Sequence, residues 1–257
     1  MKKLLSVLLA IVMVCGTMTL GFTTAFAADD AQSQTIGASS GTTGDCTWSL
    51  DDDGVLTISG EGKTDSYRQG TAPWGTGIKE LIVEEGVTQI GKSAFQDCTE
   101  LTKVTLPDSL TQIGNVAFNN CTALQSITIP KNVTRLGITA FYNCTNLLSV
   151  EFLSELRVIS SKTFSYCTKL KNVILPDSLI TINEEAFRGC TELSELKIPD
   201  SVNTIDKMAF IDCESLVSVN IPDNVTVIND STFYGCKSLE NIELPYGVTT
   251  IGNYAFD

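Results

Sequence analysis

The sequence predicts a repeat solenoid, in which short strands and turns stack as successive coils. From residue 78 onward it aligns without gaps in lines of 23 residues, and such a fixed period is the signature of a stacked array. The same apolar positions recur in every line, and seven complete copies keep one register. The phenylalanine column is Phe95, Phe118, Phe141, Phe164, Phe187, Phe210, Phe233 and Phe256, and the cysteine column is Cys98, Cys121, Cys144, Cys167, Cys190, Cys213 and Cys236.

Each copy predicts one strand and one tight turn. The segment Leu124-x-x-Ile127-x-Ile129 has the spacing of a leucine-rich repeat core, and its alternation is that of a half-buried strand. Proline follows the strand in six of the seven copies and ends it, because proline donates no ladder hydrogen bond. The Ala-Phe stretch before each cysteine predicts a short helical or 3₁₀ turn. Eight residues of a copy should point inward, as in Ile113, Ala117, Phe118, Cys121, Leu124, Ile127, Ile129 and Val133.

The third copy departs from this pattern after its strand. Residues 151–155 contain no proline, although the length of the copy is unchanged and Leu156 still fills the inward position. We therefore expect an altered turn there rather than a break in the array.

The N-terminal residues 1–27 predict a signal peptide. Two lysines precede the apolar run 4–20, and Ala25 and Ala27 provide the small residues of a cleavage site. A membrane anchor and a lipoprotein attached at Cys15 are the alternatives. No later apolar run is long enough to span a bilayer, so no membrane span is expected after cleavage.

The rest of the chain divides into three parts. Residues 28–44 are small and polar and predict a flexible linker. Residues 45–77 contain two alternating runs around an Asp-Gly turn, which predicts a β-hairpin that caps the first coil. Residues 78–257 form the leucine-rich repeat solenoid: a half repeat, seven full repeats from 90 to 250, and a truncated eighth. Because the eighth copy stops mid-repeat, we expect a fragment of a longer gene product, with a naturally ragged end as the alternative.

The charge and composition exclude several classes of function. The chain has 17 basic and 30 acidic residues and a net charge of −13, which disfavours nucleic acid as a partner. It contains no histidine, so Ser-His-Asp and Cys-His catalysis and histidine-bearing metal sites are excluded. We therefore predict no enzyme activity, no cofactor and no metal site, with paired-carboxylate hydrolysis as a minor alternative.

Two motifs that could hold a metal have simpler structural interpretations. The cysteines should stack as a column of buried thiols, because identical positions in adjacent coils point the same way; disulfides or metal binding are the alternatives. The run Asp51-Asp52-Asp53-Gly54 contains part of a calcium-loop pattern, but its flanks predict strands, and a hairpin turn is favoured.

Residues 45–257 resemble the BspA-like leucine-rich repeat family. The resemblance rests on the motif Ile-Gly-x-x-Ala-Phe-x-x-Cys-x-x-Leu, repeated seven times with variation, and on the opening segment from Trp48 to Gly60 followed by Pro73-Trp74. It implies a bacterial secreted or cell-surface protein that adheres to matrix proteins or to other cells. It names no ligand.

The best candidate for a functional site is the exposed face of the predicted sheet. Residues that flank the inward positions of an alternating strand point outward, and these positions vary from copy to copy while the inward positions hardly change. The two outward columns are Lys103, Ser126, Ser149, Asn172, Glu195, Ser218 and Asn241, and Thr105, Thr128, Glu151, Ile174, Lys197, Asn220 and Glu243.

Two functional hypotheses follow. The first is a secreted or cell-surface, adhesin-like module that binds an extracellular protein or glycan through these columns. The second is a structural spacer that displays other domains.

Overall fold

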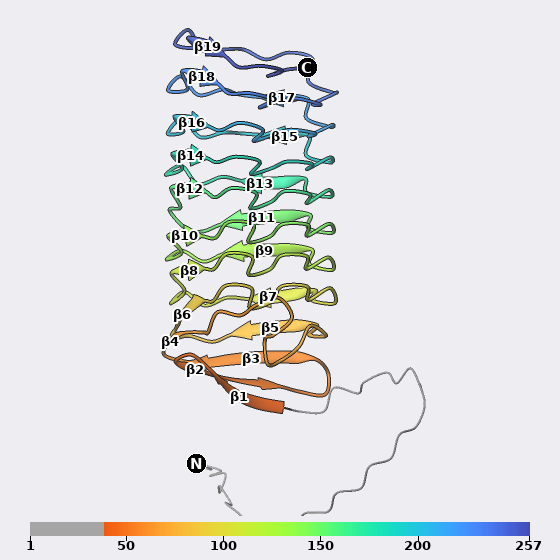
Figure 1. Ribbon diagram of the computed structural model, residues 1–257. Helices are drawn as coiled ribbons and strands as arrows, with labels where there is room; N and C mark the ends of the chain where they lie inside the picture. Colours follow the sequence, from red (N-terminus) through yellow and green to blue (C-terminus); the bar gives the residue numbers. More distant parts are fainter. Residues whose placement is uncertain (1–38) are drawn as a thin grey trace, which may run out of the picture. The chain divides into compact units, whose positions relative to one another are not determined.

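The computed structural model describes residues 39–257, and these form a β-solenoid of stacked coils (Figure 1). The predicted solenoid fold is therefore confirmed. The predicted signal peptide and residues 28–38 of the predicted linker lie outside the described residues.

One strand of most coils belongs to a parallel stack, which we call the first stack. Within a sheet, each strand of the repeats pairs with its counterpart 23 residues away in the next coil, as in the pair Ser126 and Ser149. The ladder is divided into three sheets that follow one another along the solenoid. Its strands are β3 (Val55–Gly60), β5 (Glu80–Val83), β7 (Lys103–Thr105), β9 (Ser126–Ile129), β11 (Ser149–Phe152), β13 (Asn172–Ile174), β15 (Glu195–Leu196) and β17 (Ser218–Val219).

A second parallel stack runs along another side of the coils, and the sequence did not predict it. Its inward residues are three apart, as in Val87 and Ile90 of β6, so no period-two alternation marks the strand. The strands of this second stack are β4 (Gly62–Lys63), β6 (Val87–Ile90), β8 (Gln112–Ile113), β10 (Arg135–Leu136), β12 (Val158–Ile159), β14 (Thr181–Ile182), β16 (Thr204–Ile205), β18 (Val227–Ile228) and β19 (Thr250–Ile251).

The Ala-Phe segments form successive tight turns, and the prediction of a helical or 3₁₀ turn is wrong. In one coil, Val116 and Asn120 have φ values of 61° each, which a right-handed helix does not allow. The backbone amides along these turns donate alternately to the next coil and within their own turn. The amide of Phe118 donates to Ala140 of the next coil at 2.8 Å, whereas that of Ala117 donates within its own turn to Gly114 at 3.3 Å. The turns thus bond adjacent coils, which a helix, with its amides bonded internally, does not do.

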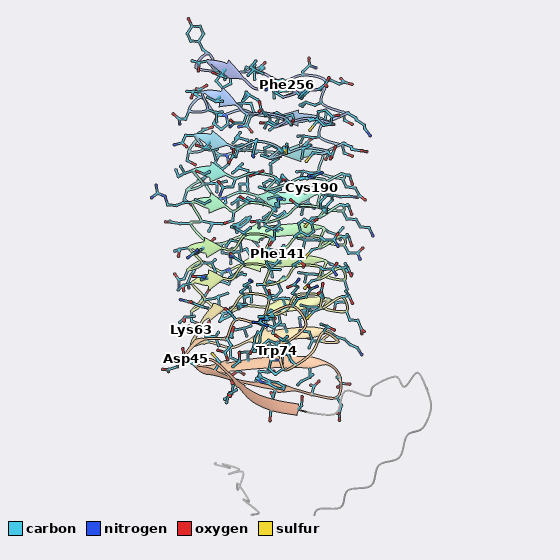
Figure 2. All side chains as sticks on the ribbon, in the orientation of Figure 1. Asp45, Lys63, Trp74, Phe141, Cys190 and Phe256 are labelled. Carbon is cyan, nitrogen blue, oxygen red and sulfur yellow. The ribbon has the colours of Figure 1, made fainter. Side chains whose placement is uncertain are left out.

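The core is a set of residue columns between the two stacks. All eight inward positions predicted for one copy are at most 3% exposed, so that prediction is confirmed. The phenylalanine rings form a continuous stack from Phe95 to Phe256, with centroids 5.1 to 5.7 Å apart. Phe141 and Cys190, labelled in the middle coils of Figure 2, are fully buried, and Trp74 lies near the first coils. Each coil therefore covers the apolar surface of its neighbour.

The N-terminal end is capped by three antiparallel strands, one more than the sequence predicted. The predicted hairpin forms from β2 (Cys46–Leu50) and β3, and β3 continues in parallel into β5. Residues Ser39–Thr43, assigned to the linker from their small polar side chains, instead form β1, which pairs with β2. Their composition hid the strand, because the pairing uses backbone groups. Gly41 also leaves room for the Trp48 ring, whose Nε1 would lie 3.0 Å from an added Cβ.

Trp48 and Trp74 cover the first coil and are 7% and 4% exposed. The Trp74 ring stacks on Phe95 at 5.5 Å, and its Nε1 donates to the carbonyl of Ala94 at 3.0 Å. Pro73, which precedes Trp74, is exposed. The Asp51–Gly54 segment is a hairpin turn, in which the carboxylate of Asp51 accepts hydrogen bonds from the amides of Asp53 and Val55.

Two copies differ from the others after the Leu-x-x position. In the third copy the chain bends at Ser154 where its neighbours form a two-residue turn, and Leu156 remains buried, which confirms the altered turn. In the seventh copy the predicted strand at Asn241–Glu243 does not form. Only the preceding coil lies beside it among the described residues, so its inward residue Ile242 is only half-buried.

A charged cluster joins two adjacent coils on the turn side. The carboxylate of Glu185 lies 3.2 Å from Lys162 Nζ and 3.0 Å from Arg188 Nη1, and its side chain is 11% exposed. Arg188 also lies over the ring of Tyr166, 5.4 Å from its centroid. Burial alone would raise the pKa of Glu185, but the hydrogen bonds from Arg188 and Lys162 outweigh it and hold this pKa below its ordinary value.

We expect Glu185→Gln to lower the melting temperature at neutral pH by at least about 2 °C, because both cations lose their carboxylate. Since the folded pKa is depressed, this stabilisation is fully present above the ordinary value of 4.5 and is lost as the pH falls through the folded value. The melting temperatures of the variant and of the unaltered protein should therefore converge as the pH is lowered from 7 to 3. Glu184→Gln, which removes the more exposed neighbouring carboxylate, is the control. A difference in melting temperature that stays constant with pH would contradict the stabilisation of ionised Glu185 by Lys162 and Arg188.

Candidate binding surface

The two predicted outward columns lie on the exposed face of the first stack. Thirteen of the fourteen side chains are exposed and Ser149 is half-buried. The register places Ser126, Ser149 and Asn172 side by side, and likewise Thr128, Glu151 and Ile174. The strands therefore bring the predicted residues of β9, β11 and β13 together on one surface, as alternation requires.

The two halves of this surface differ in how their charges are used. In the N-terminal half, Lys103 Nζ lies 2.7 Å from Glu80 Oε1, and the Thr128 hydroxyl donates to Glu151 at 3.2 Å. These side chains contact one another across adjacent coils. In the C-terminal half, Glu195, Lys197 and Glu243 make no ion pair or side-chain hydrogen bond within residues 39–257. The C-terminal half therefore leaves charged groups available to a partner.

A hollow of about 550 Å³ lies over β15 and β17 in this C-terminal half. Its floor is formed by the apolar residues Leu196, Val219 and Ile221, which are 3 to 7% exposed. Its rim consists of six residues of the predicted columns: Glu195, Lys197, Ser218, Asn220, Asn241 and Glu243.

Asn220 explains why the surface is hollow at this point. Its side-chain amide pairs with the backbone of Ile198, accepting from the amide at 2.9 Å and donating to the carbonyl at 2.8 Å. These two bonds occupy the place of the backbone ladder, and β15 and β17 are only two residues long, whereas β9 and β11 have four. Ser218 contributes a small side chain to the lining of the hollow.

A second hollow of about 460 Å³ adjoins the first and shares Glu195 and Lys197 with it. It is lined by residues of β13 and β15, among them Ile174. Ile174 is 74% exposed, and Val217, which precedes Ser218, is 51% exposed. The sequence placed Ile174 in the outward columns but did not identify Val217 or either hollow.

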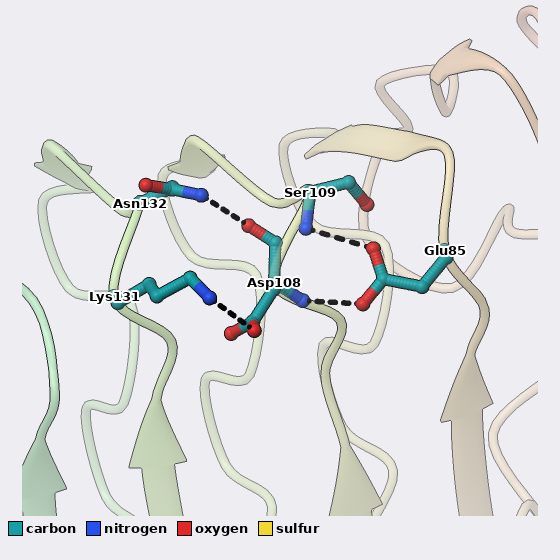
Figure 3. Close-up of polar contacts among 5 residues, drawn as sticks. All are labelled: Glu85, Asp108, Ser109, Lys131 and Asn132. Carbon is teal, nitrogen blue, oxygen red and sulfur yellow. Dashed lines mark hydrogen bonds and ion pairs between the residues drawn. The ribbon is translucent and has the colours of Figure 1, made fainter.

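The turns after the first-stack strands are held by contacts between coils (Figure 3). The two carboxylate oxygens of Glu85 accept the amides of Asp108 and Ser109 at 2.9 and 3.1 Å. Lys131 Nζ then lies 2.6 Å from Asp108 Oδ2, and the Asn132 side chain donates to the Asp108 carbonyl. These contacts fix the turns that border the surface in this part of the array.

The cysteine column is a structural feature of the core, as predicted, and not a reactive site. Except at Cys98, each thiol of the column donates to the phenylalanine carbonyl 26 residues earlier, as from Cys121 to Phe95 and from Cys144 to Phe118 at 3.2 Å. Burial, and secondarily the charge of Asp97, raises the pKa of Cys98 to about 12. A thiol held protonated is a weak nucleophile. Within residues 39–257, no group of three acidic or cysteine side chains is arranged to hold a metal ion.

Comparison with known families decides the classification. A family profile described as the BspA type leucine-rich repeat region, in six copies, matches residues 74–176 and 157–257. The chain belongs to the BspA-type leucine-rich repeat family. The match begins at Trp74, where the cap gives way to the repeats, and it confirms the resemblance predicted from the repeated motif.

Solved structures of bacterial leucine-rich repeat proteins give weaker similarities. A leucine-rich repeat protein from Bacteroides ovatus is 22% identical, with a TM-score of 0.49, over 83% of this chain and 78% of that one. A leucine-rich cell surface protein from Faecalibacterium prausnitzii is 21% identical, with a TM-score of 0.35, over 80% and 94%. A comparison with curated protein sequences finds no match. The family assignment therefore rests on the repeat profile.

Nothing in the described part of this BspA-type chain resembles a membrane-spanning helix. No helix long and apolar enough to cross a bilayer is found among residues 39–257.

Proposed function

We propose that this protein is a secreted or cell-surface, adhesin-like module that binds an extracellular protein or glycan through the exposed face of the first stack. The observation that carries the proposal is the hollow over β15 and β17, whose rim is formed by six residues of the outward columns. Membership of the BspA-type family supports a binding role for the repeats. The predicted signal peptide supports export.

The first experiment is a binding screen with the chain from residue 28 onward. Arrays of extracellular-matrix proteins and glycans would be probed, and saturable ligands would be measured by surface plasmon resonance. A spacer would give no saturable ligand with a well-folded protein.

The combined variant Glu151→Gln, Lys197→Gln and Glu243→Gln should weaken binding of such a ligand about tenfold or more, because exposed charge pairs contribute up to about 1 kcal/mol each. Its melting temperature should change little, since all three side chains are exposed. The matched control is Glu61→Gln, Arg135→Gln and Glu155→Gln, which also removes two acids and one base at exposed positions outside the columns. Equal affinity of both variants would remove this face from consideration.

A further inference from the structure

The two hollows on the first-stack face form one continuous depression. They share Glu195 and Lys197, so the depression extends from Ile174 in β13 to Glu243 in the seventh copy. Neighbouring coils are about 4.8 Å apart, and three such steps give about 14 Å. An extended chain rises about 3.3 Å per residue, so four or five residues span this length. The dimensions fit a short extended segment that lies across the strands.

The chemistry of the depression changes along its length. At one end Ile174 offers an exposed aliphatic side chain. In the centre the side chains of Ser218 and Asn241 make no hydrogen bond within residues 39–257, whereas the side-chain oxygen of Asn220 accepts from the amide of Ile198 and its nitrogen donates to the carbonyl of Ile198. The hydroxyl and the amide of these two residues are thus free to bond a peptide backbone.

The charges of the depression select for a cationic group. Glu195 and Glu243 are unpaired and are opposed by the single unpaired cation Lys197, because Lys171 is 2.9 Å from Glu192. The whole chain carries a net charge of −13, which adds to the attraction of a cation. The lining contains no aromatic side chain on which a sugar ring could stack. Protein is therefore favoured over glycan as the occupant.

We propose that this depression binds an extended segment of a partner protein, in which a central arginine or lysine contacts Glu195 and Glu243 and a flanking aliphatic side chain packs on Ile174. The proposal rests on the proposed function, since it names the partner for the same surface. The backbone of the segment is held by Ser218 and Asn241, and the apolar floor of Leu196 and Val219 takes the stem of the basic side chain.

The test uses two defined peptides, acetyl-Leu-Thr-Arg-Thr-Leu-amide and the same peptide with glutamate in place of arginine. Binding to the chain from residue 28 onward is followed by NMR chemical-shift titration at low salt. The arginine peptide should bind saturably and shift the amides of Ile174, Ser218 and Asn241, and the glutamate peptide should bind at least about tenfold more weakly. Added salt should lower the affinity of the chain for the arginine peptide, because the contacts are exposed charge pairs.

The variant Glu195→Gln with Glu243→Gln should bind the arginine peptide about tenfold more weakly, and the matched control Glu61→Gln with Glu155→Gln should bind as the unaltered chain does. The inference is overturned if both peptides bind equally, if the paired glutamine variant keeps its affinity, or if the shifted amides lie elsewhere.

The outcomes also separate this inference from the proposed function. A chain that binds a matrix protein or a glycan through the columns, but not the arginine peptide, would overturn the inference alone. A chain that binds the arginine peptide in the depression, but no matrix protein or glycan, would overturn the adhesin proposal and leave the inference standing.

Discussion

Replacing Phe141 with alanine should lower the free energy of unfolding by about 3–5 kcal/mol. The ring is fully buried, and its centroid lies 5.2 Å from Phe118 and 5.7 Å from Phe164. The substitution removes packing against two coils at once and leaves a cavity between them. Because the stack is continuous, neither neighbouring ring can move into the space without leaving its own partner.

Equilibrium denaturation by guanidinium, followed by far-ultraviolet circular dichroism, measures this effect. Tyr142→Ala is the control, because Tyr142 is the next residue but is only half-buried. This substitution should lower the free energy of unfolding by less than Phe141→Ala does. The fluorescence of Trp48 and Trp74 reports separately on the cap, which shows whether the cap unfolds with the damaged coils. A loss below about 1 kcal/mol for Phe141→Ala would contradict the structural role given to the stack.

Replacing Gly137 with alanine should destabilise the array by about 1–3 kcal/mol, although the change adds a single methyl group. A Cβ at Gly137 would lie 2.4 Å from the backbone of Gly114 and Asn115 in the preceding coil. Backbone atoms cannot rotate away as a side chain can, so the two coils must separate. Gly91, Gly114 and Gly252 occupy equivalent positions with similarly close backbone contacts, whereas Ser160 stands at this position one coil later, so the restriction applies to several coils and not to every coil.

Gly247→Ala is the matched control for this prediction. A Cβ there would meet only the carbonyl of Asp223 at 3.5 Å, which is an ordinary contact. Alanine should therefore be neutral or should stabilise by about 0.4–1 kcal/mol, because it restricts the unfolded chain. Thermal melts of the two variants would show opposite or clearly unequal shifts. Equal decreases in the melting temperatures of the two variants would mean that the approach of Gly137 to Gly114 does not limit the coil spacing.

The sequence predicted those parts of the fold that depend on side-chain burial. The inward columns, such as Ile113, Phe118 and Leu124, recur because each must pack on its counterpart in the next coil. The features it missed depend on the backbone. The second stack has only two-residue strands in most coils, and the turns around Phe118 use left-handed residues such as Val116, for which the sequence contains no glycine signal.

The candidate site was predictable as a surface but not as a hollow. Alternation sufficed to place residues such as Lys197 and Ser218 outward, because the strand itself sets that direction. The hollow depends on Asn220 bonding the backbone of Ile198, and the same asparagine exposed to water would look identical in sequence. The unpaired state of Glu195 and Glu243 likewise depends on which side chains face them across the coils. These are properties of contacts between copies, and one copy alone does not contain them.

The direction of the bonds between coils also determines how the array should respond to tension. The strands of both stacks bond to the coils above and below, and β1 and β19 lie at opposite ends of the stack (Figure 1). A force applied to these ends loads the bonds of one terminal coil before those of the next, whereas a force along the strands of a sheet shears all its bonds together. A BspA-type array stretched between two surfaces would therefore unfold coil by coil and lengthen in steps. After a brief pull, some coils would be unfolded and the others would remain folded as a template on which the unfolded coils refold.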